Sequence, residues 1–252
     1  MSTGNPGVVL VTGAARRIGR AIALDLACHG WIVAVHYSGS AEAADETVGE
    51  IVAAGGRAAA FAADLADESQ VETLVPRCAA EFGPLGCLIN NASRFENDRL
   101  QTATRESWDA HLDVNLRAPL VLIRAFAAQL PPGMQGNVIN VLDQRVWNPG
   151  PDFLSYTLSK CGLWTLTRTL ALELAPAVRV NGVGPGPALP SRRQSRAQFA
   201  AHCARMPLGR GTTPEEICEA VRFILAAPAM TGQMIALDGG EHLVRPTWAD
   251  GE

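Results

Sequence analysis

Tyr156 and Lys160 are the two side chains whose types and spacing could do acid–base chemistry in this sequence of 252 residues. They lie four positions apart in a helical pattern, which places them on one face of a helix. A phenol has an unperturbed pKa of about 10, and a neighbouring ammonium stabilises the phenolate and lowers that pKa. Lys160 is the chain's single lysine, which favours a site that needs a compact ammonium. The alternative is that one lysine remains by chance in an arginine-biased composition. The motif Tyr-x-x-x-Lys is also common in surface helices, so it carries little weight alone.

A glycine turn near the start of the chain could hold a phosphate. Residues 8–12 form an apolar run rich in β-branched side chains, and a helical pattern follows the turn. Backbone N–H groups and the helix dipole meet a pyrophosphate at such a junction. We therefore expect Gly13, Ile18 and Gly19 to line a dinucleotide site, although turns of this kind also serve packing alone.

The end of the second predicted strand indicates which dinucleotide binds. Sites for NAD carry an acidic residue there to accept hydrogen bonds from the ribose, and this chain has no carboxylate at that point. Arg17 in the glycine turn, with nearby hydroxyl groups, suits a 2′-phosphate instead. Arg17 as a solvated charge is the alternative, although arginine is poorly placed at a helix N-terminus. We predict NADPH, with contacts from Arg17, His36, Tyr37, Ser38 and Ser40.

Alternating strand and helix patterns predict how these residues are brought together. Strands are expected at residues 8–12, 31–37, 58–62, 87–90, 137–142, 179–183 and 233–237. Helices are expected at residues 18–26, 41–54, 67–82, 105–130, 153–174 and 214–225. This order predicts an α/β fold: a Rossmann-type, doubly wound, parallel seven-stranded sheet with helices on both faces, formed by residues 1–252 as a single domain.

Residues 184–205 begin with an irregular stretch, residues 184–196, that is too long for a simple βα connection. The stretch contains Pro185, Pro187 and Pro190, and arginines follow at 192, 193 and 196. We expect this segment to be a mobile substrate lid, with a plain surface loop as the alternative.

Composition points to small-molecule chemistry in the cytoplasm. The net charge of -4 offers no general attraction to nucleic acid or to anionic lipid. The six cysteines have no zinc-ligand spacing, so no metal site is expected. No secretory signal pattern begins the chain, and no apolar run reaches the length of a membrane span.

Together these motifs resemble the short-chain dehydrogenase/reductase family across nearly the whole chain. The family's catalytic asparagine, serine, tyrosine and lysine match Asn115, Asp143, Tyr156 and Lys160. Two positions depart from the family pattern: Asp143 stands where most members carry serine, and Arg17 replaces the middle glycine of the turn. The resemblance implies further cofactor contacts at Asp64, Leu65, Asn91, Ala92, Ser93, Pro185 and Gly186.

Asp143 indicates which subgroup of the family the chain resembles. Asp-x12-Tyr-x-x-x-Lys, with an arginine in the glycine turn, resembles the pteridine reductases and the bacterial dihydromonapterin reductases. In pteridine reductases the phenylalanine that matches Phe95 stacks on the pterin, and an aromatic slab suits a flat heterocycle. A carboxyl group at 143 suits protonation of a ring nitrogen. Substrate contacts are therefore expected at Ser93, Phe95, Asp143, Tyr156 and Leu189.

The leading hypothesis is NADPH-dependent reduction of a dihydropterin-like ring. The alternatives are a reductase of ketones, quinones or 3-oxoacyl compounds, and a non-enzymatic NADPH-binding sensor. A sensor should have lost residues of the catalytic set, and Asn115, Tyr156 and Lys160 are all present. The resemblance also implies a homotetramer, built on helices 105–130 and 153–174.

Overall fold

Seven strands form a parallel sheet in the computed structural model, which describes residues 6–191 and 194–244. The strand order is β3-β2-β1-β4-β5-β6-β7, and every neighbouring pair is parallel. The strands are β1 (Val8–Val11), β2 (Ile32–Tyr37), β3 (Ala58–Ala62), β4 (Leu85–Asn90), β5 (Gly136–Val141), β6 (Val178–Pro185) and β7 (Met234–Leu237). The predicted fold class is confirmed.

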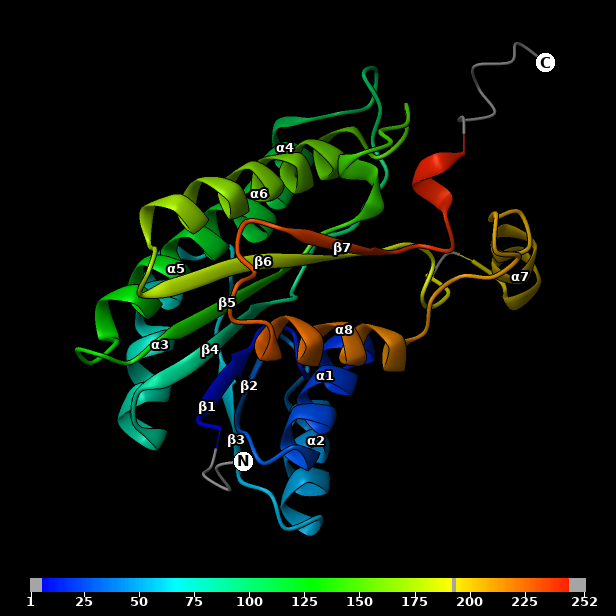
Figure 1. Cartoon of the computed structure of the whole chain (residues 1–252). Helices are drawn as coiled ribbons and strands as arrows, with labels where there is room; N and C mark the ends of the chain where they lie inside the picture. Colours follow the sequence, from blue (N-terminus) through cyan, green and yellow to red (C-terminus); the bar gives the residue numbers. More distant parts are fainter. Residues whose placement is uncertain (1–5, 192–193, 245–252) are drawn as a thin grey trace, which may run out of the picture.

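Helices cover both faces of the sheet (Figure 1). Side chains alternate along each strand, so Val8 and Leu10 of β1 pack with α3, α5 and α6, whereas Val9 and Val11 pack with α1, α2 and α8. The helices are α1 (Arg17–Cys28), α2 (Ala41–Ala53), α3 (Glu68–Phe82), α4 (Arg105–Leu112), α5 (Ala118–Gln129), α6 (Leu154–Glu173), α7 (Arg196–Cys203) and α8 (Pro214–Ala226). Two apolar cores therefore hold the sheet rigid from either side.

The strand order reverses beside β1, where the chain passes from β3 to β4 on the other side. The carboxyl ends of the strands near such a switch point are where open α/β sheets bind ligands. The glycine turn follows β1, residues 91–95 follow β4, and Asp143 comes two residues after β5. The predicted functional residues therefore converge at one edge of the sheet.

The prediction of a single α-helix over residues 105–130 is wrong in one detail. A π-helical turn, η1 (Asp113–Arg117), lies between α4 and α5 and contains Asn115. Such a turn inserts an extra residue into the helix, and π turns of this kind are frequent at functional sites. Apolar periodicity does not reveal it, because the helix continues on both sides of the turn.

The segment predicted to be a lid contains regular structure that the sequence did not indicate. Strand β6 extends to Pro185, and α7 occupies Arg196–Cys203 with Ser195 as its N-terminal cap. Positions 192 and 193 of the predicted lid lie outside the described residues. No helix within residues 6–191 and 194–244 has both the length and the apolar character needed to cross a membrane.

Candidate active site

The glycine turn is closely packed against the loop after β4. Gly13 has a φ of 62°, and a Cβ there would lie 3.0 Å from the Ala92 Cα. A Cβ on Gly19 would lie 2.3 Å from the Gly13 carbonyl oxygen. Both positions therefore need glycine, one for its backbone conformation and both for space.

Hydrogen bonds clamp this turn to the end of β4. The Thr12 hydroxyl oxygen accepts from the backbone N–H of Asn91 at 2.9 Å and of Ala92 at 3.0 Å. The Asn91 side-chain amide donates to the Thr12 carbonyl at 2.8 Å. Asn91 and Ala92, predicted as cofactor contacts, thus fix the shape of the turn.

His36 supports the turn from β2, a role that the sequence did not reveal. Its Nδ1 accepts the backbone N–H of Gly13 at 3.0 Å, and its Nε2 lies 3.1 Å from the Ala63 carbonyl oxygen. The imidazole is buried, and burial lowers its pKa to about 4. A neutral ring with the proton on Nε2 satisfies both contacts, so His36 links the ends of β1, β2 and β3.

The N-terminus of α1 fits an anionic cofactor. No side chain caps this end of the helix, and its first turn contains no acidic residue. Backbone N–H groups of the first turn have no partners within the helix, and together with the helix dipole they favour a bound anion. A dinucleotide pyrophosphate meets these requirements, and Gly13, Ile18 and Gly19 surround the position.

Arg17 makes a contact that the sequence did not indicate. Its φ of 56° explains why glycine is usual at this position in the family that the turn resembles. The guanidinium donates to the carbonyl oxygens of Pro190 at 3.0 Å and Leu189 at 3.3 Å. Arg17 therefore joins the glycine turn to the lid, and its predicted contact with a 2′-phosphate stays a prediction.

The other predicted adenosine contacts surround the carboxyl ends of β2 and β3. Ser38 is exposed, and Ser40 occupies the position before α2 without capping it. The Asp64 carboxylate accepts the backbone N–H of Ala66 at 3.0 Å and is otherwise exposed, whereas Leu65 is buried. Tyr37, at the end of β2, is half-buried. These cofactor contacts stay predictions.

Asp143, Tyr156 and Lys160 form the centre of the site. The Tyr156 hydroxyl donates to Asp143 Oδ2 at 2.8 Å, and Asp143 Oδ1 accepts the backbone N–H of Arg145 at 2.9 Å. Lys160 Nζ donates to the carbonyl oxygen of Val141 at 2.8 Å and lies 5.8 Å from the centre of the Tyr156 ring. The carboxyl end of β5 and the first turns of α6 therefore bring the three predicted catalytic groups together.

The electrostatics of this centre differ from the expected lowering of the tyrosine pKa. Burial and the adjacent Asp143 carboxylate raise the pKa of Tyr156 well above 10. Burial also lowers the pKa of Lys160 to about 8 and raises the pKa of Asp143. In this arrangement Tyr156 holds its proton and donates a hydrogen bond to Asp143. A carboxyl group with a raised pKa is a better proton donor near neutral pH.

Asn115 connects α6 to the loop after β4. Its Oδ1 accepts from the Arg94 backbone N–H at 2.8 Å and from the Ser93 hydroxyl at 3.1 Å. Its Nδ2 donates to the Ser159 hydroxyl at 2.9 Å, and that hydroxyl donates to the Tyr156 carbonyl at 2.6 Å. The side-chain amide of Asn115 in the π turn thus fixes the position of Ser93 relative to α6.

Phe95 lies against Tyr156. Its ring centre is 4.7 Å from that of Tyr156, edge to face, and 4.5 Å from that of Phe153, stacked. The Arg145 guanidinium lies 5.0 Å from the centre of the Phe153 ring. Sequence reasoning missed Phe153, whose only signal was an aromatic residue three positions before Tyr156. These rings form an aromatic wall that a flat substrate can contact.

The remaining predicted contacts lie where β6 leads into the lid. Pro185 pairs with Leu237 of β7, and the Gly186 N–H donates to the Leu237 carbonyl at 3.0 Å. A Cβ on Gly186 would lie 2.8 Å from the Asp238 Cα, so this backbone is closely packed. Leu189 is half-buried and is held by Arg17.

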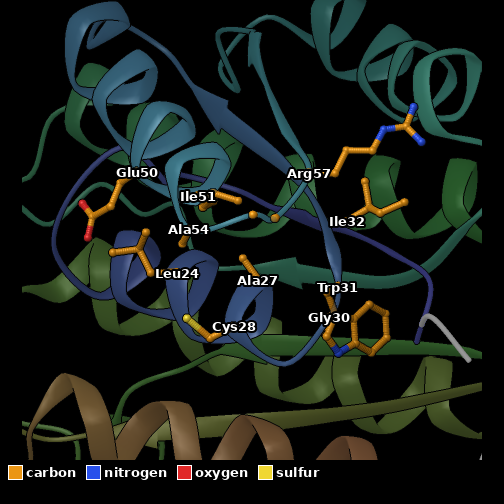
Figure 2. Close-up of a pocket in the computed structure, with 12 residues that line it drawn as sticks. Leu24, Ala27, Cys28, Gly30, Trp31, Ile32, Glu50, Ile51, Ala54 and Arg57 are labelled. Carbon is orange, nitrogen blue, oxygen red and sulfur yellow. The ribbon is translucent and has the colours of Figure 1, made fainter. Parts of the chain in front are cut away.

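A cavity of about 490 Å³ lies away from these residues, between α1 and α2 (Figure 2). Trp31 and Ile32 from the start of β2 line it together with Arg57, which precedes β3. It is therefore at the amino edge of the sheet, opposite the carboxyl edge where Tyr156 lies. The cavity takes no part in the candidate active site.

The fold and this constellation define a short-chain dehydrogenase/reductase. The model of the family described as enoyl-(acyl carrier protein) reductase matches residues 13–242, and the chain belongs to this family.

Both curated relatives and solved structures resemble the chain over nearly its full length. A 3-oxoacyl-[acyl-carrier-protein] reductase from Synechocystis sp. is 35% identical over 92% of this chain and 96% of the relative. The crystal structure of FolM alternative dihydrofolate reductase 1 from Brucella canis, complexed with NADP, is 44% identical, with a TM-score of 0.93 and 96% of each chain covered. The corresponding Brucella suis structure, also with NADP, is 45% identical, with a TM-score of 0.92, and covers 95% of this chain and 96% of that one.

Proposed function

We propose that this protein is an NADPH-dependent reductase of a dihydropterin-like ring. The observation that carries the proposal is the hydrogen bond between the Tyr156 hydroxyl and Asp143, where most family members have serine. Identities of 44% and 45% to two alternative dihydrofolate reductases, against 35% to a 3-oxoacyl reductase, support the same reading.

The residues around the α1 N-terminus would hold NADPH. Its pyrophosphate would lie against the uncapped backbone of the turn at Gly13, and Ser38 and Ser40 are within the loop that would meet the 2′-phosphate. NADP is present in both Brucella structures. When bound, NADPH supplies a hydride to an electron-poor carbon.

The protein's own groups supply the proton. The Asp143 carboxyl, whose pKa is raised by burial, can donate its proton to a ring nitrogen and regain one from water, while Tyr156 keeps its proton and orients the carboxyl through their hydrogen bond. Lys160, with three donors and one of them bonded to Val141, can hold the ribose hydroxyls of the cofactor. Phe95 provides a flat apolar surface beside Tyr156 for the ring.

The test is NADPH oxidation, followed at 340 nm, with 7,8-dihydropterins as substrates. Replacing a general acid costs about 10²–10⁴ in rate, so Asp143→Ser and Asp143→Ala are both expected to lose dihydropterin turnover. Asp109→Ser, which removes an exposed carboxylate from α4, is the matched control. If Asp143→Ser raises turnover while Asp143→Ala leaves it intact, the carboxyl has no such role.

A 3-oxoacyl reductase is the second candidate, because the Synechocystis relative carries that name. A 3-oxoacyl ketone needs a neutral hydroxyl donor beside the tyrosine, and Asp143 replaces it with a carboxyl group. Acetoacetyl thioester reduction distinguishes the two functions. Turnover of the thioester with none of the dihydropterins would establish the second candidate.

We also propose that the protein forms a homotetramer. A groove of about 620 Å³ runs between η1, α5 and α6 and is lined by Leu116, Leu120 and Leu166, all half-buried. Light scattering after gel filtration measures the assembly, and Leu120→Glu is expected to dissociate it because a charge would enter an apolar contact.

A further inference from the structure

A buried polar cluster lies next to the catalytic tyrosine but outside the chemistry described above. It contains Asp98, His111 and Ser155, each less than 5% exposed, with Ser107 at its edge. The three residue types match those of hydrolytic triads, but the arrangement does not. Asp98 bonds to the serine instead of the histidine, and the serine hydroxyl is buried between them. The arrangement therefore does not provide a hydrolytic nucleophile, and these residues serve to hold segments of the chain together.

Asp98 caps helix α6 from a separate loop. The residue at the usual capping position is Phe153, whose φ is 60° and whose side chain makes no capping hydrogen bond. The Leu154 N–H instead donates to the Asp98 carbonyl at 3.0 Å, and the Ser155 N–H donates to Asp98 Oδ1 at 3.0 Å. A carboxylate at this end of a helix also interacts favourably with the helix dipole.

The second carboxylate oxygen ties the same cap to α4. Asp98 Oδ2 accepts from the Ser155 hydroxyl at 2.5 Å and from the Ser107 hydroxyl at 2.9 Å. Burial acts against ionisation of Asp98, but hydrogen bonds from Ser155 and Ser107 outweigh it and hold the pKa of the carboxyl below its usual value. Both oxygens are therefore used as acceptors in the charged form.

His111 connects this cap to the loop that carries Phe95. Its Nε2 accepts the Glu96 backbone N–H at 3.1 Å, so the proton of a neutral ring is on Nδ1. Nδ1 lies 2.8 Å from the Ser107 carbonyl oxygen and 2.7 Å from the Ser155 hydroxyl. The backbone directly after Phe95 is thereby fixed to the residue directly before Tyr156.

We propose that Asp98 is a positioning residue that sets the distance between Phe95 and Tyr156. It caps the catalytic helix from the substrate-facing loop, and with Ser155 and His111 it makes loop 95–98 and the first turn of α6 move as one unit. Phe95 and Tyr156 are in edge-to-face contact at 4.7 Å, and this spacing defines one wall of the site. The role does not depend on whether the substrate is a dihydropterin or a 3-oxoacyl compound.

The test compares Asp98→Ala with a cap of the same kind elsewhere. Asp67 caps α3 through the Ser69 N–H at 3.0 Å, and α3 carries no residue of the site. Both Asp98→Ala and Asp67→Ala are expected to lower the melting temperature. Only Asp98→Ala is expected to lower kcat, by roughly tenfold, because misplacing a reacting group by about 1 Å costs up to about a hundredfold. NADPH affinity, measured by cofactor fluorescence, should stay at the wild-type value in both.

Activity is measured well below both melting temperatures, with whichever of 7,8-dihydropterin and acetoacetyl thioester the wild type reduces. Asp98→Asn keeps an acceptor for the Ser155 N–H but loses an acceptor for the two hydroxyls, and its kcat should lie between those of wild type and Asp98→Ala. This variant carries the test if Asp98→Ala does not fold. Amide hydrogen exchange gives an independent readout, since Leu154 and Ser155 should exchange faster in the Asp98 variants and not in Asp67→Ala. Wild-type kcat in a folded Asp98 variant would overturn the proposal.

Discussion

At the scale of single residues, Asp143 decides what the site can do. A serine at this position would donate a neutral hydrogen bond, whereas a carboxyl group accepts one from Tyr156 and, after burial, is the next cause of the raised pKa of the phenol. The tyrosine is thus held as an acid and not as a phenolate. Lys160 contributes mainly by its donors, because its ammonium lies 5.8 Å from the phenol ring and bonds to Val141.

Arg145 tunes this pair electrostatically. Its positive charge lowers the pKa of Asp143 and of Tyr156, against the larger effect of burial. We predict that Arg145→Met raises both pKa values, because that charge is lost. The basic limb of the kcat against pH profile, where Asp143 loses the proton it donates, should therefore move to higher pH. Arg168→Met, which removes a cation stacked on Trp164 elsewhere on α6, is the control. An unchanged profile for Arg145→Met would contradict the assignment.

At the scale of elements, the sequence predicted the sheet, its seven strands and the region of the site. Apolar runs and glycine turns identify buried parallel strands well, because both faces of each strand are covered. The π turn at Asn115 and the external cap of α6 could not be predicted. Each depends on contacts between segments distant in the chain, such as Asp98 with Ser155. The local pattern of apolar residues carries no information about such contacts.

His36 shows the same limit, since its role depends on three strands. The sequence predicted the end of β2 as part of the cofactor region, but it did not reveal that both ring nitrogens are used inside the protein. A polar residue in a strand is read as facing either the ligand or the solvent. Only the positions of Gly13 and Ala63 in the structure show that the imidazole connects the backbone after β1 with the backbone after β3.

Burial of His36 predicts a pH dependence of stability. Its pKa is about 4 in the folded protein against 6.5 as the ordinary value, so protonation favours the unfolded chain. The contribution is fully present above pH 6.5 and is lost as the pH falls towards 4, by up to about 3 kcal/mol. Urea unfolding at pH 7.5 and pH 5 measures it.

The matched variants for this prediction are His36→Leu and His29→Leu. His36→Leu should be less stable than wild type at pH 7.5 and should lose less stability on acidification. His29→Leu is the control because it removes an exposed histidine at the end of α1 and leaves the contacts of His36 in place. Equal pH dependence in wild type and His36→Leu would refute the linkage.

At the scale of the whole molecule, Arg17 joins segments 173 positions apart, the glycine turn and the lid at Pro190. The glycine turn and the predicted lid are therefore connected by hydrogen bonds of Arg17. The strand order explains how this arises, because β1 and β6 are separated only by β4 and β5 and both end at the same edge of the sheet.

Replacing Arg17 with glycine distinguishes the effect of the backbone conformation at position 17 from the effect of the arginine side chain. Arg17 has a left-handed φ of 56°, which costs roughly 1–2 kcal/mol in a non-glycine residue, whereas glycine loses more conformational entropy on folding. These terms offset each other, so Arg17→Gly should leave the free energy of unfolding within about 1 kcal/mol of wild type. Loss of the two hydrogen bonds to the predicted lid should appear instead as faster amide exchange at Ala188, Leu189 and Ser191, which flank Pro190. Arg16→Gly, next to it and without a capping contact, is the control. Wild-type exchange in the lid of Arg17→Gly would show that the guanidinium does not restrain it.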